Sequence, residues 1–485
     1  MFVKKFTLFV IAASMLGTIG ARAQDAGALL DLLVKKHLIT DKEAEAVRAD
    51  LSKEAASTSA DKWKLSTPIT ELELYGDARV RYEIRNGETG SPNFVDPRRD
   101  TLQRNRARYR LRFGLKGQLT DDWFFGIRLE TSTSSRSTNV TFGDDGGPFG
   151  KASDNLNVGQ AYLGYTGIKD LKLTAGKIAN PFVTTSMVWD GDINPEGMSE
   201  QFKHTFDISG GGDGSQVASM SKDGKGVVTT TASEPRKITI DLFANFGQFV
   251  YDDVNPDNPI GHNGLAHTDA FLLGWQVGAK VNFSKAMYFQ VAPTLYNYTG
   301  HGDSFNGAYS GDPDFRDGAG DRLSLNQSAI NSLLVFELPV EFGWKMGQLP
   351  MRIFGDFAAN LEADDRAAAA GHPEKDDQAF AYQIGVSVGQ MKKKNDWQLA
   401  AFWQHVEQYA LDPNLVDSDI FDGRVNMEGP AITFGYALSN AVTANLTYAY
   451  GWQADDSLGT GGTGDIGFNP LRKFQVFQAD LSVKF

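Results

Sequence analysis

Residues 104–112 read Arg-Asn-Arg-Ala-Arg-Tyr-Arg-Leu-Arg, so an arginine occupies every second position. The row consists of Arg104, Arg106, Arg108, Arg110 and Arg112. Small or apolar residues hold the alternate positions. A period of two is that of a β-strand, which predicts one arginine face and one apolar face. A soluble sheet would expose the arginines to water, whereas a membrane barrel would turn the apolar face to lipid and the arginines to a wet lumen.

Composition narrows the choice between these two interpretations. The chain has 485 residues, which is long for one soluble domain but suits a single large barrel. It has no cysteine, so disulfides and thiol chemistry are excluded. The net charge of −13 argues against a nucleic-acid-binding protein. With 32 phenylalanines and a mean hydropathy of −0.31, the chain is aromatic-rich yet hydrophilic, as a barrel with one wet face would be.

The N-terminus has the pattern of an export signal. Two lysines precede an apolar run over Phe6–Ile19, and Ala21–Ala23 fits a small-x-small cleavage site. We therefore expect residues 1–23 to be a signal peptide. An uncleaved anchor helix is the alternative, but the run is shorter than the roughly 20 residues that span a bilayer.

The next segment has helical periodicity. Residues 24–52 carry an apolar stripe, and Thr40 with Glu43 forms a capping box at the start of a second helix. We expect a periplasmic helical segment, either a trimerising plug or a leader packed loosely on the barrel. Residues 53–70 are rich in Ser, Ala and Thr and read as a linker.

From residue 71 to residue 485 the pattern has a period of two. Segments of alternating polarity are separated in turn by short connections and by long ones, which is typical of outer-membrane barrels with short periplasmic turns and long external loops. The sequence thus predicts an all-β fold, a transmembrane antiparallel β-barrel of about 16 strands with a short N-terminal helical segment. Gly210–Pro235 is long yet falls on the short-turn side, so it is either a periplasmic insertion or a sign of a miscounted strand pair.

The last strand ends on Phe485 without a tail. Such an ending resembles the signal that the barrel assembly machinery reads. An ordinary amphipathic last strand is the alternative.

Motifs for enzymatic or metal chemistry are weak. Gly459–Gly464 matches G-x-G-x-x-G, but no helix follows, so the context for phosphate binding is missing. No nucleophile elbow or P-loop occurs, and we expect no enzyme and no cofactor. Two loops carry closely spaced aspartates, Asp312–Gly318 and Asp417–Gly423, which could bind Ca²⁺ or bridge to lipopolysaccharide through divalent ions. Solvated acidic loops are the simpler interpretation, and we predict no metal site.

The arginines are the best candidates for function. The polar faces of neighbouring strands add four more to the row, Arg79, Arg81, Arg85 and Arg128. We predict that all nine line a pore, because arginine rings select anions and the charge of arginine does not titrate away. Three carboxylates share this face, namely Asp77, Glu83 and Glu130. They could neutralise the wall, so the anion preference stays open.

The chain resembles the putative porin family of Gram-negative outer membranes, similar in style to phosphate-selective porins. The resemblance covers roughly residues 70–485 and rests on the arginine row with Phe113–Leu115 and on four short motifs. These are Gly176-Lys177, Asn180–Phe182, Trp189-Asp190 and Asn194–Gly197. It implies a porin, often trimeric. In porins the third external loop folds into the pore. Here that loop is Ala179–Glu200, with Trp189, Asp190, Asp192 and Glu196 as candidate constriction residues.

Together these observations favour a porin of the cell outer membrane that passes small hydrophilic solutes or ions by diffusion. Its expected partners are lipid, lipopolysaccharide, the barrel assembly machinery and two further copies in a homotrimer, with no nucleic acid. A structural or adhesive barrel with a closed lumen is the alternative. A soluble secreted β-protein is the third possibility.

Overall fold

The computed structural model describes the following parts of the chain: residues 40, 44–45, 47, 66–89, 100–132, 137–143, 156–208, 238–252, 270–299, 333–462, 464–466 and 470–485. The predicted signal peptide and nearly all of the predicted helical segment and linker lie outside these residues. No helix in the described part of the chain is long and apolar enough to cross a bilayer.

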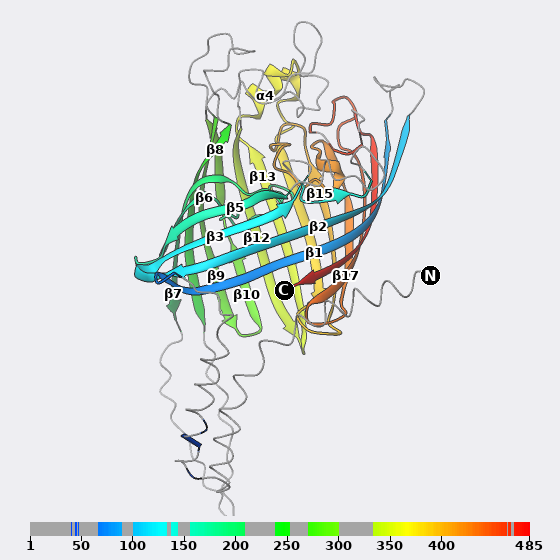
Figure 1. Cartoon of the computed structure of the whole chain (residues 1–485). Helices are drawn as coiled ribbons and strands as arrows, with labels where there is room; N and C mark the ends of the chain where they lie inside the picture. Colours follow the sequence, from blue (N-terminus) through cyan, green and yellow to red (C-terminus); the bar gives the residue numbers. More distant parts are fainter. Residues whose placement is uncertain are drawn as a thin grey trace, which may run out of the picture. The chain divides into compact units, whose positions relative to one another are not determined.

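Eighteen strand segments form one antiparallel sheet (Figure 1). Along the chain they are β1 (Ile69–Glu88), β2 (Thr101–Leu119), β3 (Trp123–Thr131), β4 (Val140–Thr141), β5 (Leu156–Tyr165), β6 (Leu171–Lys177), β7 (Glu196–Asp207), β8 (Thr239–Asp252), β9 (Ala270–Ser284), β10 (Met287–Val291), β11 (Thr294–Thr299), β12 (Leu334–Met346), β13 (Leu349–Asn360), β14 (Phe380–Gly389), β15 (Trp397–Val406), β16 (Met427–Ala437), β17 (Val442–Gln453) and β18 (Lys473–Lys484). Helix is confined to α4 (Ala363–Ala369) and short 3₁₀ turns among the described residues, apart from a fragment near residue 44.

The sheet closes on itself as a barrel of 16 strands. Strand β1 pairs with β2 on one side and with β18 on the other. Strands β10 and β11 are two parts of one barrel strand, because both pair with β9 and β12 and only Ala292 and Pro293 separate them. Proline lacks the N–H that a ladder needs, which accounts for the break. The two-residue β4 only flanks β2. The predicted fold class is confirmed.

Connection length separates the two ends of the barrel. Three of the short turns that join neighbouring strands are residues 120–122, 285–286 and 347–348. The β7–β8 connection lies on this same end, and the two strands pair without interruption from Gly197↔Phe249 to Asp207↔Thr239. The long segment predicted as an insertion therefore joins two adjacent strands, and its own residues 209–237 lie outside the described residues.

The two faces of the wall differ as the period of two predicts. Apolar side chains such as Leu74, Val80 and Ile127 are about half exposed on the outer face, where a bilayer would cover them. Polar side chains such as Arg81, Gln276 and Glu337 are buried on the inner face. At the seam, the backbone of Phe485 exchanges two hydrogen bonds with Gly76, at 2.9 and 3.1 Å. The C-terminal residue thus takes part in closing the barrel.

Candidate functional site

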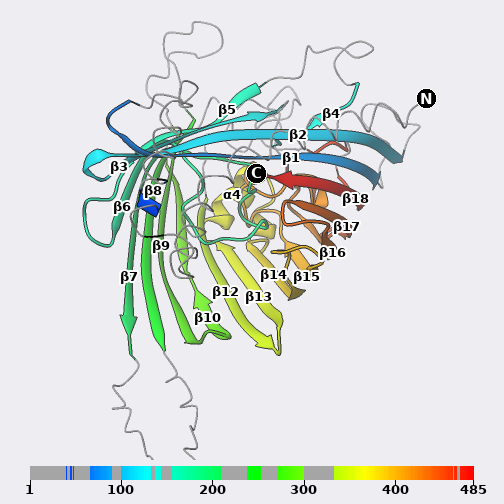
Figure 2. The same cartoon turned by 60° about the horizontal axis from the view of Figure 1, so that its bottom comes forward.

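The connection between β6 and β7, residues 178–195, crosses the interior of the barrel, and we call it the crossing loop. On one side Thr184 donates a hydrogen bond to Glu337 of β12 at 2.6 Å, and Thr185 donates one to Asp356 of β13 at 2.5 Å. On the other side Asp192 approaches two arginines of β2. Strands β2 and β12–β13 lie on opposite sides of the barrel (Figure 2). Only a loop inside the lumen can contact both walls.

Apolar packing holds the middle of the crossing loop. Trp189 is 4% exposed, and its ring lies 6.4 Å from that of Phe249 and 6.2 Å from that of Tyr296. Phe182 meets Tyr296 edge-on at 5.4 Å. Such aromatic pairs each add about 0.5–1.5 kcal/mol beyond the burial of area. Trp189 therefore anchors the loop against β8 and β11.

A second loop docks onto the crossing loop. The connection between β15 and β16 brings Ser418 to Asp190, whose Oδ2 accepts bonds from the Ser418 backbone N–H and hydroxyl at 3.0 Å each. The backbone N–H of Asp417 bonds to Ser186 O. Burial, followed by the charge of Asp192, raises the pKa of Asp190 to about 6. Burial and the charge of Asp190 likewise raise the pKa of Asp417 well above its usual value.

The arginines of β1 point into the lumen and meet carboxylates. Arg81 is 4% exposed and lies 2.7 Å from Asp480 and 2.6 Å from Asp419. Arg85 is 1% exposed and lies 2.9 Å from Asp422 and 3.3 Å from Asp465. These aspartates come mostly from the β15–β16 and β17–β18 loops. The β1 arginines thus fasten two long loops inside the barrel.

The arginine row of β2 is paired as well. Arg106 bonds to both Glu83 and Asp465, and Arg104 lies 3.0 Å from Asp465. Arg108 lies 3.7 Å from Glu83 and donates to the Asn139 carbonyl at 3.1 Å. Further along the strand, both remaining arginines contact Asp77 and approach Asp192. Arg110 lies 2.8 Å from Asp77 and 3.7 Å from Asp192. Arg112 lies 2.7 Å from Asp77 and 3.6 Å from Asp192.

The remaining predicted residues fall into two groups. Arg79 donates to Asn139 Oδ1 at 2.5 Å, and Arg128 pairs with Glu130 at 2.7 Å, both on the inner face. Glu196 shares its face of β7 with Met198, whose side chain is 53% exposed, and it pairs with Lys177 at 2.8 Å. The structure therefore brings Asp192 to the arginines, whereas Glu196 lies on the outer face.

The charges within this network nearly balance. Burial alone would raise the pKa of Asp419, but Arg81 and Arg85 outweigh it and hold the pKa well below its usual value. For Asp465 as well, the positive charges of Arg85 and Arg106 outweigh the effect of burial and lower the pKa. Both carboxylates are therefore ionised at neutral pH. Arginines and carboxylates form a tight network with little free charge on the side of the long loops.

One of the two aspartate-rich segments is now explained by this network. Asp419 and Asp422 serve as partners of arginines, as described above. Among the described residues no three carboxylate or histidine side chains gather as metal ligands. The other segment, Asp312–Gly318, lies outside the described residues.

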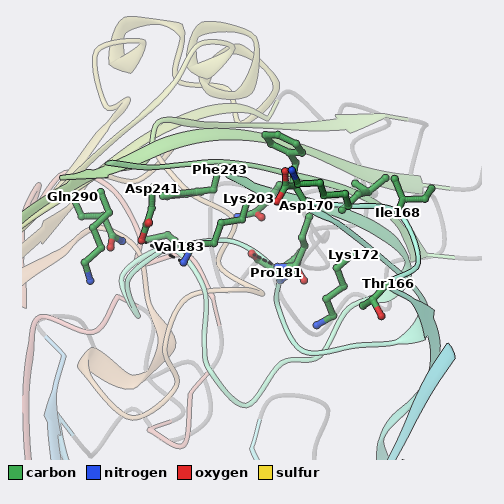
Figure 3. A pocket seen from close by; sticks show the side chains of 16 residues that line it. Thr166, Ile168, Asp170, Lys172, Pro181, Val183, Lys203, Asp241, Phe243 and Gln290 are labelled. Carbon is green, nitrogen blue, oxygen red and sulfur yellow. Dashed lines mark hydrogen bonds and ion pairs between the residues drawn. The ribbon is translucent and has the colours of Figure 1, made fainter. Parts of the chain in front are cut away.

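Several inner-face groups carry no signal in the sequence that marks them as members of a site. Asp465 sits in a glycine-rich loop with nothing to mark it as an arginine partner. Beneath the crossing loop, towards the short turns, lies a cavity of about 700 Å³ lined by Lys172, Lys203, Asp241 and Lys280 among others (Figure 3). Lys203 pairs with Asp241 at 3.4 Å. Period-two alternation could have placed these lysines in the lumen but not beside one another.

Comparison with known proteins assigns the family. The sequence profile of the family described as putative porin matches residues 86–304 and 335–485, well over half of the chain. No curated protein matches the sequence.

Solved structures of bacterial porins are similar at low identity. A triple mutant of the Rhodopseudomonas blastica porin is 11% identical, with a TM-score of 0.37 over 86% of this chain and 100% of that chain. A loop-deletion mutant of OmpT, an outer membrane protein of Vibrio cholerae, is 10% identical, with a TM-score of 0.38 over 86% and 99%. These likenesses are too distant to carry an argument, so the fold rests on the strand pairing. With a family profile that spans most of a closed barrel, the chain belongs to the putative porin family of outer-membrane proteins.

Proposed function

We propose that this porin is a passive diffusion channel for small hydrophilic solutes or ions, narrowed by the crossing loop and by the arginine network. The observation that carries the proposal is a loop held across the lumen by contacts to both walls, since this leaves a restricted passage in place of a wide pore. Because the carboxylates offset most of the arginine charge, we infer only a modest preference for anions at this level of the pore.

Solute flux into liposomes tests this directly. Proteoliposomes containing the purified barrel should swell in small sugars at a rate that falls with solute size and does not saturate with concentration. Liposomes that stay impermeable to the smallest sugar would instead favour the closed structural barrel, whose loops fill the lumen.

We further propose a homotrimer surrounded by outer-membrane lipid and lipopolysaccharide, inserted by the barrel assembly machinery through Phe485. The exposed apolar outer face and the terminal strand that closes on Gly76 support membrane insertion. Native mass spectrometry of the detergent-solubilised protein should give three copies, and a single copy would contradict the trimer.

A further inference from the structure

A second group of lumen cations lies near the short turns, and it differs from the arginine network in forming no ion pair among the described residues. Lys116 of β2 and Lys172 of β6 both point to the inner face, because they share the alternation of Arg112 and Thr174. Neither forms an ion pair within the part of the chain that the structure describes, whereas every arginine of the row does. Glu73 lies opposite Lys116 in the strand register, but no ion pair joins the two.

Each of these ammonium groups rests on an aromatic ring. Lys116 Nζ lies 4.2 Å from the centre of the Tyr75 ring, and Lys172 Nζ lies 5.3 Å from that of Phe124. A cation–π contact holds an ammonium group in place without removing its positive charge, as a salt bridge to a carboxylate would. The rings thus hold two positive charges at fixed places on the wall.

Glycines fix the rings themselves. Tyr75 lies opposite Gly114 and Phe124 opposite Gly164 in the strand registers. A Cβ added to Gly114 would come within 2.5 Å of Tyr75 Cζ, and one on Gly164 within 2.1 Å of Phe124 Cζ. Only glycine lets these rings lie against the wall, so one ring face meets backbone and the other meets the ammonium group.

Both lysines line one cavity of about 390 Å³ under the crossing loop. The residues around it include Arg128, Thr174 and Gln201, and no described residue that lines it is a carboxylate. Thr174 is 7% exposed, and its hydroxyl has no hydrogen-bond partner among the described residues. A buried hydroxyl without a partner costs free energy unless a ligand or water accepts its proton. Lys172 also lines the larger cavity beside it, where Figure 3 shows its side chain.

We propose that Lys116, Lys172 and the Thr174 hydroxyl form a binding subsite for a small oxyanion with two negative charges, reached from the short-turn side of the crossing loop. Two ammonium groups match a double charge, and ammonium and hydroxyl donors both bond to oxygen. The inference rests on the proposed channel in that the subsite would lie on the solute path. It places the free positive charge of the lumen on the lysines and not on the arginine row.

The test is a titration of inorganic phosphate onto the full-length protein in detergent by isothermal calorimetry. Wild type should bind phosphate saturably, and Lys116→Gln/Lys172→Gln should bind at least about tenfold more weakly. Lys172→Arg, which keeps the charge, should retain most of the affinity. The matched control is Lys392→Gln/Lys393→Gln in the exposed β14–β15 turn, which removes the same charge and should bind like wild type.

Two outcomes would overturn the subsite. The first is an absence of saturable phosphate binding by wild type. The second is a Lys116/Lys172 variant that binds as tightly as wild type while its heat-modifiable migration shows a folded barrel. The readout does not require current or flux. Phosphate binding in a barrel that passes no solute would therefore refute the channel and retain the subsite, and flux without binding would do the reverse.

Discussion

At the scale of single residues, the inner wall is organised by how completely each charge is paired. Arg85 is the extreme case, since it is 1% exposed and lies within 3.3 Å of Glu83, Asp419 and Asp465 and 2.9 Å from Asp422. Burying such a group costs several kcal/mol, which only these contacts offset. Arg104 differs in burial, since it is 33% exposed and lies 3.0 Å from Asp465.

Removing Arg85 should therefore destabilise the barrel strongly. Arg85→Met leaves buried carboxylates without their cation, and we expect a loss of about 3–5 kcal/mol. Arg104→Met is the control and should cost less, about 1 kcal/mol, because Arg104 keeps a third of its surface in water. Thermal unfolding midpoints in detergent compare the two. Equal midpoints would show that the network does not hold the loops.

Gly114 tests the packing of an aromatic ring on the wall. Gly114→Ala would place a Cβ 2.5 Å from Tyr75 Cζ, so the ring must move, and we expect a destabilisation of about 1–3 kcal/mol. At Gly355 the nearest atom to an added Cβ is Gln383 O at 3.6 Å, so Gly355→Ala should change stability by less than about 0.5 kcal/mol. Chemical unfolding of both variants measures the difference. A Gly114→Ala barrel as stable as wild type would mean that the ring is free to shift.

The sequence made these residue-scale features only partly predictable. Alternation placed Arg81, Arg106 and Arg128 on one face, because a strand fixes the side of every residue. Alternation puts Glu196 on the same face of its strand as Met198 and Phe202. That this is the outer face can be recognised only once the bounds of the strand are known. The partners Asp419 and Asp465 could not be predicted, since they depend on how long loops fold back over hundreds of residues.

At the scale of elements, the crossing loop is the piece that would narrow the lumen in the proposed channel. It packs through Trp189, and hydrogen bonds to Glu337, Asp356 and Ser418 hold it on both sides of that residue. No described cation pairs with Glu337 or Asp356. Glu337 accepts hydrogen bonds from the hydroxyls of Thr184 and of Tyr296, and Asp356 accepts one from Thr185. The loop is therefore docked on this side through hydrogen bonds to buried carboxylates.

The contact between Asp190 and the β15–β16 loop predicts a pH dependence. The pKa of Asp190 is raised to about 6, so the docked loop favours the protonated form. The stabilisation is present below the unfolded pKa and is lost as pH rises through about 6. We expect more frequent opening transitions in single-channel records at pH 8 than at pH 5. Asp190→Asn should flatten this dependence, and an Asn variant that keeps the wild-type pH profile would contradict the role of Asp190.

The strands themselves were predictable because their period of two is uninterrupted over long segments. The break between β10 and β11 follows from Pro293, a residue that no central ladder accommodates easily. The path of the crossing loop was anticipated only through the family resemblance, since residues 178–195 have no periodicity of their own. Its contacts to Glu337 and Asp356 required the closed barrel.

At the scale of the whole molecule, closure between β1 and β18 removes every free sheet edge and leaves an interior that the loops and charges divide into two zones. Towards the long loops, arginines and carboxylates neutralise one another. Towards the short turns, Lys116 and Lys172 keep their charge, and cavities of about 390 and 700 Å³ remain. In the proposed channel, a solute entering from the long-loop side would meet the nearly neutral network first and the basic cavities beyond it.

Single-channel recording in planar bilayers tests the central claim most directly. Purified, folded protein should insert into the bilayer in KCl with discrete steps of ohmic current. In a KCl gradient, the reversal potential should have the sign that indicates a preference for chloride, and it should be small. Lys116→Gln/Lys172→Gln should move that potential towards zero more than Arg104→Ser does. A folded barrel that inserts but passes no current would contradict the account.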